Sequence, residues 1–140
     1  MKVLLDTCAL AELRHPQGNA AVKAAVALIP DDDLYLSVLV VGEVAKGVDL
    51  LRDGRKKRGL QAWLAGLENQ FADRILPVDH ETGRLWGEIT ARTQQAGLIL
   101  PAIDGLLAAT AQLHGLHVMT RHRRHFAPTG TLIVDPWAGP

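Results

Sequence analysis

The stretch Val3-Leu4-Leu5-Asp6-Thr7, near the start of the chain, decides the fold. Its first three residues form a short apolar run, which is typical of a buried strand, and Asp6 and Thr7 end that run. A helical pattern follows at once over residues 9–14. A buried strand followed directly by a helix indicates an α/β protein, in which strands and helices alternate.

The same alternation continues along the chain. Further apolar runs predict strands over residues 34–36, 75–78, 118–120 and 131–134. Helical patterns lie between them over residues 20–29, from the cap Ser37 to about residue 51, over 55–71, from the cap Asp79 to Gly97, and over 101–115. The acidic run over residues 31–33 is predicted to be a solvated loop. Because short apolar strands separated by helices form parallel sheets covered on both faces, we predict a three-layer α/β/α domain with a central parallel sheet of four to five strands.

The composition fits one globular domain over residues 1–140. A chain of 140 residues buries roughly two-thirds of the surface of its unfolded form. Hydrophobic residues make up 48% and charged residues 21%, and the mean hydropathy is +0.08, which excludes disordered and collagen-like chains. No apolar run approaches the roughly 20 residues of a membrane span, and Asp6 interrupts the apolar N-terminal segment before a signal peptide could form. The single cysteine, Cys8, closes no internal disulfide, so we expect a cytoplasmic protein.

Three carboxylates differ from the other acidic residues because they interrupt apolar stretches. They are Asp6, Glu43 and Asp104. Asp6 follows the first strand, at the edge where open parallel sheets bind ligands. Each acid also has a purely structural interpretation: Asp6 as a helix cap, Glu43 as an exposed helix residue and Asp104 as a first-turn acid stabilised by the helix dipole. The sequence leaves both interpretations open for each residue.

Three acids that meet at one sheet edge would repel one another unless a cation neutralised them. Oxygen-only ligation suits Mg²⁺ or Mn²⁺ rather than zinc, and Mg²⁺ sites are commonly completed by a phosphate of the substrate. Such a site indicates metal-assisted hydrolysis of a phosphodiester. The spacing of the three acids does not establish this by itself, because their convergence depends on the fold.

The order of short motifs over residues 3–137 resembles the PIN-domain proteins, specifically the VapC-type ribonuclease toxins of bacterial type II toxin–antitoxin modules. The motifs are Leu4-Leu5-Asp6-Thr7, Leu34-Tyr35-Leu36-Ser37, Val41-Gly42-Glu43-Val44 with Gly47, Gly54-Arg55-Lys56-Lys57, Arg74-Ile75-Leu76-Pro77-Val78-Asp79, Leu100-Pro101 with Asp104, Ala108-Ala109-Thr110-Ala111, Thr120-Arg121 and Asp135-Pro136-Trp137.

The resemblance implies a PIN-like fold and a Mg²⁺- or Mn²⁺-dependent endoribonuclease. It also implies a cognate VapB-like antitoxin that holds the enzyme inactive, and a homodimer. Asp6, Glu43 and Asp104 match the three invariant metal-binding acids of the family. We expect Thr7 and Thr120 to support these acids, Thr120 through its hydroxyl. The antitoxin is expected to lay a short helix in an apolar groove between the second and third helices and to send a basic side chain toward the acids.

The chain departs from the family pattern at three positions. Cys8 stands where asparagine is common, so a weak hydrogen-bond acceptor replaces a strong one. His122 and His125 stand where the family often has acids, and a neutral histidine adds no negative charge. We therefore expect one tightly held cation rather than two. His122 is interpreted either as a contact to substrate or to a metal ligand, or as an ordinary surface histidine.

Two basic runs are candidate nucleic-acid contacts. The chain has 15 basic and 15 acidic residues, so RNA binding must come from local patches. Arg121, Arg123 and Arg124 follow the strand over 118–120 and are predicted to contact RNA phosphates beside the cut site, unless they only form a solvated loop. The run Arg55-Lys56-Lys57-Arg58 starts a helix, where its charge opposes the helix dipole. It is interpreted as a surface for RNA or for antitoxin acids.

Two other functional classes compete with this hypothesis. Cys8 and Arg14 have the Cys-x5-Arg spacing of a cysteine phosphatase, although the helix-forming residues between them, including Glu12, argue against a phosphate-binding loop. The other class is a catalytically degenerate PIN module that only binds RNA or protein, which the residues Cys8 and His122 make plausible.

Overall fold

The centre of the molecule is a five-stranded sheet in which every neighbouring pair is parallel. The computed structural model describes residues 1–139. The strand order is β3-β2-β1-β4-β5, which confirms the prediction of four to five parallel strands. The strands are β1 (Val3–Leu5), β2 (Leu34–Ser37), β3 (Ile75–Leu76), β4 (His117–Met119) and β5 (Ile133–Val134).

The carboxyl ends of the strands lie together at one edge of the sheet. Leu5 pairs with Met119 at the end of β1 and β4, and Met119 pairs with Val134 at the end of β5. From β1 the chain builds β2 and β3 on one side and later adds β4 and β5 on the other. The reversal creates a crevice beyond the ends of β1 and β4, which is where open α/β sheets bind ligands.

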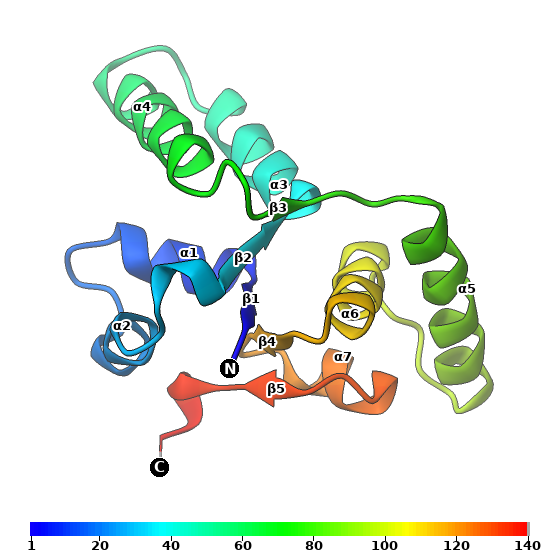
Figure 1. The fold of residues 1–140 in the computed structure, drawn as a ribbon. Helices are drawn as coiled ribbons and strands as arrows, with labels where there is room; N and C mark the ends of the chain where they lie inside the picture. Colours follow the sequence, from blue (N-terminus) through cyan, green and yellow to red (C-terminus); the bar gives the residue numbers. More distant parts are fainter. Residues whose placement is uncertain (140) are drawn as a thin grey trace.

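Helices cover both faces of the sheet, as the predicted three-layer architecture requires. On one side lie α1 (Thr7–Arg14) and α2 (Ala20–Ala27), and on the other α6 (Ala102–His114) lies beside the sheet with α5 (His80–Gln95) outside it (Figure 1). Beyond β3, a hairpin of α3 (Val38–Asp49) and α4 (Arg55–Gln70) extends from the sheet (Figure 1). The short helix α7 (Arg123–Phe126) connects β4 to β5.

The central strands are buried on both faces, which explains their unbroken apolar runs. All three residues of β1 are fully buried. One core cluster joins these strands to α1, α2, α4 and α6, and a smaller cluster around Ile89, Leu100 and Ala109 joins α5 to α6. Burial of these side chains stabilises the sheet, and the carboxyl ends of its strands determine where the three carboxylates lie.

The main difference from the predicted elements lies after β4. The sequence predicts no helix over the basic run, whereas residues 123–126 form α7 and residues 127–129 form a 3₁₀ turn. Phe126 is fully buried and anchors this segment, and a four-residue helix is too short to produce a recognisable apolar period. The run Asp31–Asp33 also forms a 3₁₀ turn rather than an irregular loop. The strands predicted over 75–78 and 131–134 are shorter, at two residues each.

The basic run at the start of α4 lies at the tip of the α3–α4 hairpin. Lys57 donates to a carboxylate oxygen of Asp53 at 3.3 Å and to the carbonyl of Asp49 at 3.5 Å. Arg55, Lys56 and Arg58 are exposed, so water screens their unfavourable interaction with the helix dipole.

The cap of α5 gives a test of local stability by pH. The Asp79 carboxylate accepts from the backbone N–H of Thr82 at 3.0 Å and from its hydroxyl at 2.8 Å. These bonds lower the pKa of Asp79 below its ordinary 3.8. A carboxyl group with a lowered pKa stabilises the fold above its unfolded pKa, and that contribution is lost as the pH falls through the folded pKa. Asp79→Ala is therefore expected to lower the Tm at neutral pH, and the difference should shrink below about pH 4.

Thermal melts from neutral pH to about pH 3 measure this difference. Asp79→Asn is the matched control, because an uncharged amide oxygen still caps a helix. The difference in Tm between Asp79→Asn and Asp79→Ala should not change with pH. If the wild-type advantage over Asp79→Ala stayed constant down to the lowest pH, the ionised carboxylate would not be the stabilising group.

Candidate active site

Asp6 is positioned by the junction of β1 and α1. Its side chain accepts from the backbone N–H of Ala9 at 2.9 Å and so caps α1. Its own N–H donates to the carbonyl of Met119 at the end of β4, at 3.3 Å. The capping interpretation is therefore correct, but it does not exclude a functional one, because the second carboxylate oxygen is not used by the cap.

The electrostatics of Asp6 are unusual for a helix cap. The residue is only 5% exposed, and burial raises its pKa above the ordinary 3.8; the negative charge of Asp104 adds to the rise. Hydrogen bonds from the Thr120 hydroxyl and the Ala9 N–H act in the opposite direction without offsetting the burial. A nearby cation would favour the ionised form of this carboxyl.

Glu43 reaches the same region from α3. Ser37 caps that helix by accepting from the backbone N–H of Leu39 at 3.1 Å, so α3 begins directly at the carboxyl end of β2. The Thr7 hydroxyl donates to Oε1 of Glu43 at 2.6 Å. Thr7 is the first residue of α1, so this bond joins the helices that follow β1 and β2 and orients the Glu43 carboxylate.

Asp104 comes from the first turn of α6. That helix has no side-chain cap, so an acid in its first turn is favourable for the helix dipole. The Oδ2 atom of Asp104 lies 2.6 Å from Nδ1 of His125, and the two side chains are 21% and 35% exposed. Asp104 thus has a specific partner on α7, which joins α6 to α7.

The three carboxylates line one cavity of about 130 Å³. Its lining includes Asp6, Thr7, Cys8, Glu43, Asp104 and His122. The cavity lies at the carboxyl edge of the sheet, next to β1 and β4. The structure therefore brings three acids that are distant in the sequence to the wall of one cavity.

The donor chemistry of this cavity suits a hard divalent cation, because carboxylate oxygens are the ligands that Mg²⁺ and Mn²⁺ prefer. Within residues 1–139, however, no three histidine, cysteine, aspartate or glutamate side chains are grouped closely enough to hold one metal ion. One oxygen of Glu43 is bonded to Thr7 and one oxygen of Asp104 faces His125. The cavity has the oxygen ligands that such a cation requires. In this structure, however, the Glu43 carboxylate is hydrogen-bonded to Thr7 and the Asp104 carboxylate to His125.

Comparison with known proteins identifies the family of the chain. The sequence pattern of the PIN domain matches residues 3–130. The chain belongs to the PIN domain family. It is 36% identical to Toxin FitB of Neisseria gonorrhoeae, over 96% of this chain and 98% of that one. It is 32% identical to VapC ribonuclease Y4jK of Sinorhizobium fredii, over 96% and 97%.

Solved structures match the fold over most of the chain. The crystal structure of FitAcB from Neisseria gonorrhoeae matches with a TM-score of 0.92 and 36% identity, over 96% of this chain and 98% of that one. DNA-bound VapBC from Salmonella typhimurium matches with a TM-score of 0.79 and 22% identity, over 97% and 98%. The second likeness concerns the fold alone.

Cys8 in this PIN domain is not a phosphatase nucleophile. Residues 7–14 form α1, so no phosphate-binding loop connects Cys8 to Arg14. Burial raises the pKa of the Cys8 thiol to about 11, and the charge of Asp6 adds to the rise. The thiol is therefore protonated at neutral pH and a poor nucleophile. Its sulfur lies 3.2 Å from Nε2 of His122.

His122 and Thr120 lie where the PIN resemblance predicts supporting residues. Thr120 is fully buried, and its hydroxyl oxygen accepts from the backbone N–H of His122 at 3.0 Å. His122 is exposed and lines the acidic cavity, so both interpretations of this histidine remain open. The arginines that follow it are exposed. Arg123 lies 3.7 Å from the Asp135 carboxylate, whereas no ion pair is described for Arg121 or Arg124 within residues 1–139.

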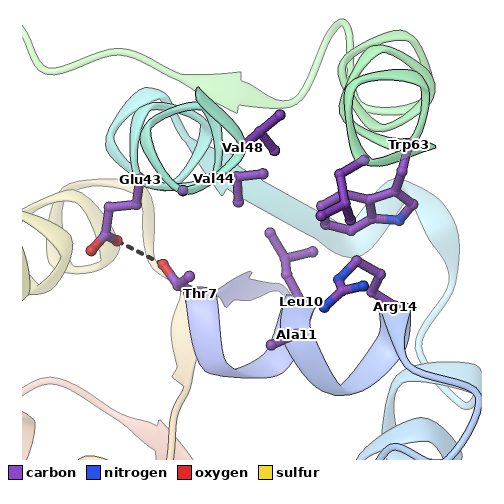
Figure 2. Close-up of a pocket in the computed structure, with 10 residues that line it drawn as sticks. Thr7, Leu10, Ala11, Arg14, Glu43, Val44, Val48 and Trp63 are labelled. Carbon is purple, nitrogen blue, oxygen red and sulfur yellow. Dashed lines mark hydrogen bonds between the residues drawn. The ribbon is translucent and has the colours of Figure 1, made fainter. Parts of the chain in front are cut away.

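An apolar groove of about 240 Å³ adjoins the acidic cavity of this PIN domain. Figure 2 shows Leu10, Ala11 and Arg14 on α1 facing Val44 and Val48 on α3, with Trp63 of α4 on the far side. Thr7 and Glu43 line both the groove and the acidic cavity. The sequence analysis expects the antitoxin groove between the second and third helices, α2 and α3. The groove in the structure lies elsewhere, because α1, α3 and α4 line it. The hairpin of α3 and α4 brings α4 rather than α2 to this side.

Two contacts of the site were not predicted from the sequence. They are the bond from Thr7 to Glu43 and the pairing of His125 with Asp104, whose partners are 36 and 21 residues apart. The only sequence signal for the contact between His125 and Asp104 was the presence of a histidine where the family often has an acid. Among the described residues, no helix is sufficiently long and apolar to cross a membrane.

Proposed function

We propose that this PIN domain is a metal-dependent endoribonuclease and the toxin of a type II toxin–antitoxin module. The observation that carries the proposal is the meeting of Asp6, Glu43 and Asp104 in one cavity at the carboxyl edge of the sheet. In this proposal the three carboxylates hold Mg²⁺ or Mn²⁺. The names of the relatives, a toxin and a VapC ribonuclease, support the same activity.

A bound divalent cation supplies Lewis-acid chemistry: it lowers the pKa of a coordinated water and neutralises charge on a phosphate. The protein's contribution is to hold the carboxylates and the RNA. Asp6 is the most rigid of the three, because it is buried and fixed by the N–H of Ala9. Hydrolysis joins a water oxygen to phosphorus, breaks one phosphorus–oxygen ester bond and returns a proton to the leaving oxygen.

The supporting residues act on this site in different ways. Thr7 orients Glu43 through its hydroxyl, and the Thr120 hydroxyl near Asp6 lowers the pKa of that carboxyl. His122 faces the cavity, where an imidazole N–H is able to donate to a phosphate oxygen. In this proposal the exposed side chains of Arg121, Arg123 and Arg124, which flank His122 in the sequence, neutralise RNA phosphates beside the cut site.

The partner in this proposal is a cognate VapB-like antitoxin whose short helix occupies the groove between α1, α3 and α4. Solved complexes named FitAB and VapBC support a two-protein assembly. The groove is apolar along Leu10, Val44 and Val48 and opens on Glu43, so a helix with an apolar face and one basic side chain fits it. We also expect a homodimer in the cytoplasm.

Metal removal tests the catalytic part of the proposal. The purified protein, freed of antitoxin, is expected to cut single-stranded RNA with Mg²⁺ or Mn²⁺, to lose cleavage in EDTA and to regain it with excess Mn²⁺. Gel analysis of end-labelled RNA measures all three states. Persistent cleavage in EDTA would contradict a metal-dependent mechanism.

A catalytically degenerate PIN module is the second candidate. The observation that favours it is that no three ligating side chains are grouped around one point in the described part of the chain. This candidate is expected to bind RNA in a gel-shift assay without cutting it under any metal condition. Wild-type protein that bound Mn²⁺ no better than Asp6→Asn would favour the degenerate module.

A further inference from the structure

His125 is the closest polar neighbour that the structure gives to Asp104. Its Nδ1 atom lies 2.6 Å from Oδ2 of Asp104. An ionised carboxylate only accepts hydrogen bonds, so Nδ1 must carry the proton in this pair. The Nδ1 atom is thereby occupied as a donor, and one of the two Asp104 oxygens is bonded to it.

The backbone around His125 is held rigidly. Phe126, the next residue, is fully buried and anchors α7 in the core. The backbone N–H of His125 donates to the carbonyl of His122 at 3.0 Å. These contacts hold the His125 backbone near Asp104, whereas the direction of the partly exposed imidazole is given by its contacts with Asp104 and His122.

The face of the imidazole has a second partner inside the site. The rings of His125 and His122 are stacked, with centroids 5.6 Å apart and an interplanar angle of 17°. His122 in turn contacts Cys8 at 3.2 Å. A continuous row of side chains therefore runs from Asp104 through both histidines to Cys8, and Asp104, His122 and Cys8 of this row line the acidic cavity.

We propose that His125 is a positioning residue for Asp104: its Nδ1–H holds one carboxylate oxygen so that the other is presented to the cation. This inference rests on the proposed function, since it needs Asp104 to be a metal ligand. Hydrogen-bonded partners of metal ligands fix ligand orientation, and their loss typically costs 10–100-fold in metal affinity. His125 thus acts through Asp104 and adds no negative charge of its own.

His125 could instead weaken metal binding, and this opposite effect makes the proposal testable. If the imidazole only competed with the cation for the Asp104 carboxylate, its removal would strengthen metal binding. If His125 contributed only to folding, its removal would change the Tm without a selective change in affinity. Metal affinity measured directly on folded protein separates these cases.

The test is calorimetric titration of Mn²⁺ into full-length wild type, His125→Ala, His125→Asn, Asp104→Asn and the control His80→Ala. His80 is exposed at the start of α5, outside the acidic cavity. We expect His125→Ala to weaken Mn²⁺ binding about tenfold or more. His125→Asn should stay within about threefold of wild type, because its amide N–H₂ replaces the Nδ1 donor. His80→Ala should match wild type.

An affinity for Mn²⁺ that was unchanged or tighter in His125→Ala, while Asp104→Asn lost binding, would overturn the positioning role and leave the proposed function intact. His125→Asn as weak as His125→Ala, with equal Tm values, would overturn it as well. If Asp104→Asn bound Mn²⁺ like wild type, both the proposed metal site and the role of His125 would fall.

Discussion

Asp6→Asn is expected to reduce RNA cleavage by at least about a hundredfold, because partners that only orient metal ligands already cost 10–100-fold when they are removed. Asparagine is close to aspartate in shape, and its side-chain oxygen can still accept from the N–H of Ala9 and cap α1. The substitution removes one negative charge from the cavity without removing the cap. Initial rates on a labelled RNA with saturating Mn²⁺ measure the loss.

The stability of the same variant separates a catalytic effect from unfolding. Burial raises the pKa of Asp6, so its ionised form weakens the fold at neutral pH, and this cost disappears once the pH falls below the unfolded value and the carboxyl is protonated in both states. In EDTA at neutral pH, Asp6→Asn is therefore expected to melt at the same temperature as wild type or higher. Asp79→Asn, the same change at the cap of α5, is the matched control and should cut RNA normally. Wild-type rates in Asp6→Asn would refute the site assignment.

The strands and most helices were predictable because their signals are local. Buried parallel strands produce unbroken apolar runs such as Val3–Leu5, and side-chain caps such as Ser37 and Asp79 mark helix starts directly. The five parallel strands and the three layers followed from the alternation of these elements. The strand order did not, because it depends on crossovers that leave no local pattern.

The meeting of Asp6, Glu43 and Asp104 could be predicted only through the fold. Each acid stands at the start of an element or one turn into it, and only the sheet edge brings these positions together. Their hydrogen-bond partners escaped prediction for a simple reason. Thr7 and Glu43 are 36 residues apart, and α7, which carries His125, is too short to show a helical period.

The position of the groove was not predicted correctly, because the groove forms only where three helices pack together. The sequence indicates which helices are amphipathic but not how a hairpin turns. Gly54, with a φ of 156°, begins the return of the chain into α4 after the tip of α3, and this conformation favours glycine. The return brings Trp63 opposite α1 (Figure 2), which excludes α2 from the groove wall.

Gly47→Leu is expected to weaken binding of the cognate antitoxin by about thirtyfold or more, the effect of a change of about 2 kcal/mol at the centre of an interface. Gly47 lines the groove on α3. A Cβ added there meets no other atom within 4 Å, so the backbone at this position has room for a side chain. A leucine there would fill space that the antitoxin helix needs. Calorimetric titration of antitoxin into purified protein measures the affinity.

Gly66→Leu is the matched control for that variant. Gly66 lies within α4 (Arg55–Gln70), outside the groove lining, and its added Cβ also meets nothing within 4 Å. Both substitutions replace a helical glycine, so both should raise helix stability by similar amounts, on the order of 0.5–1 kcal/mol. Equal antitoxin affinities for the two variants would show that the helix docks elsewhere. Selective loss in Gly47→Leu is the result that a groove formed by α1, α3 and α4 requires, since only that leucine projects between these helices.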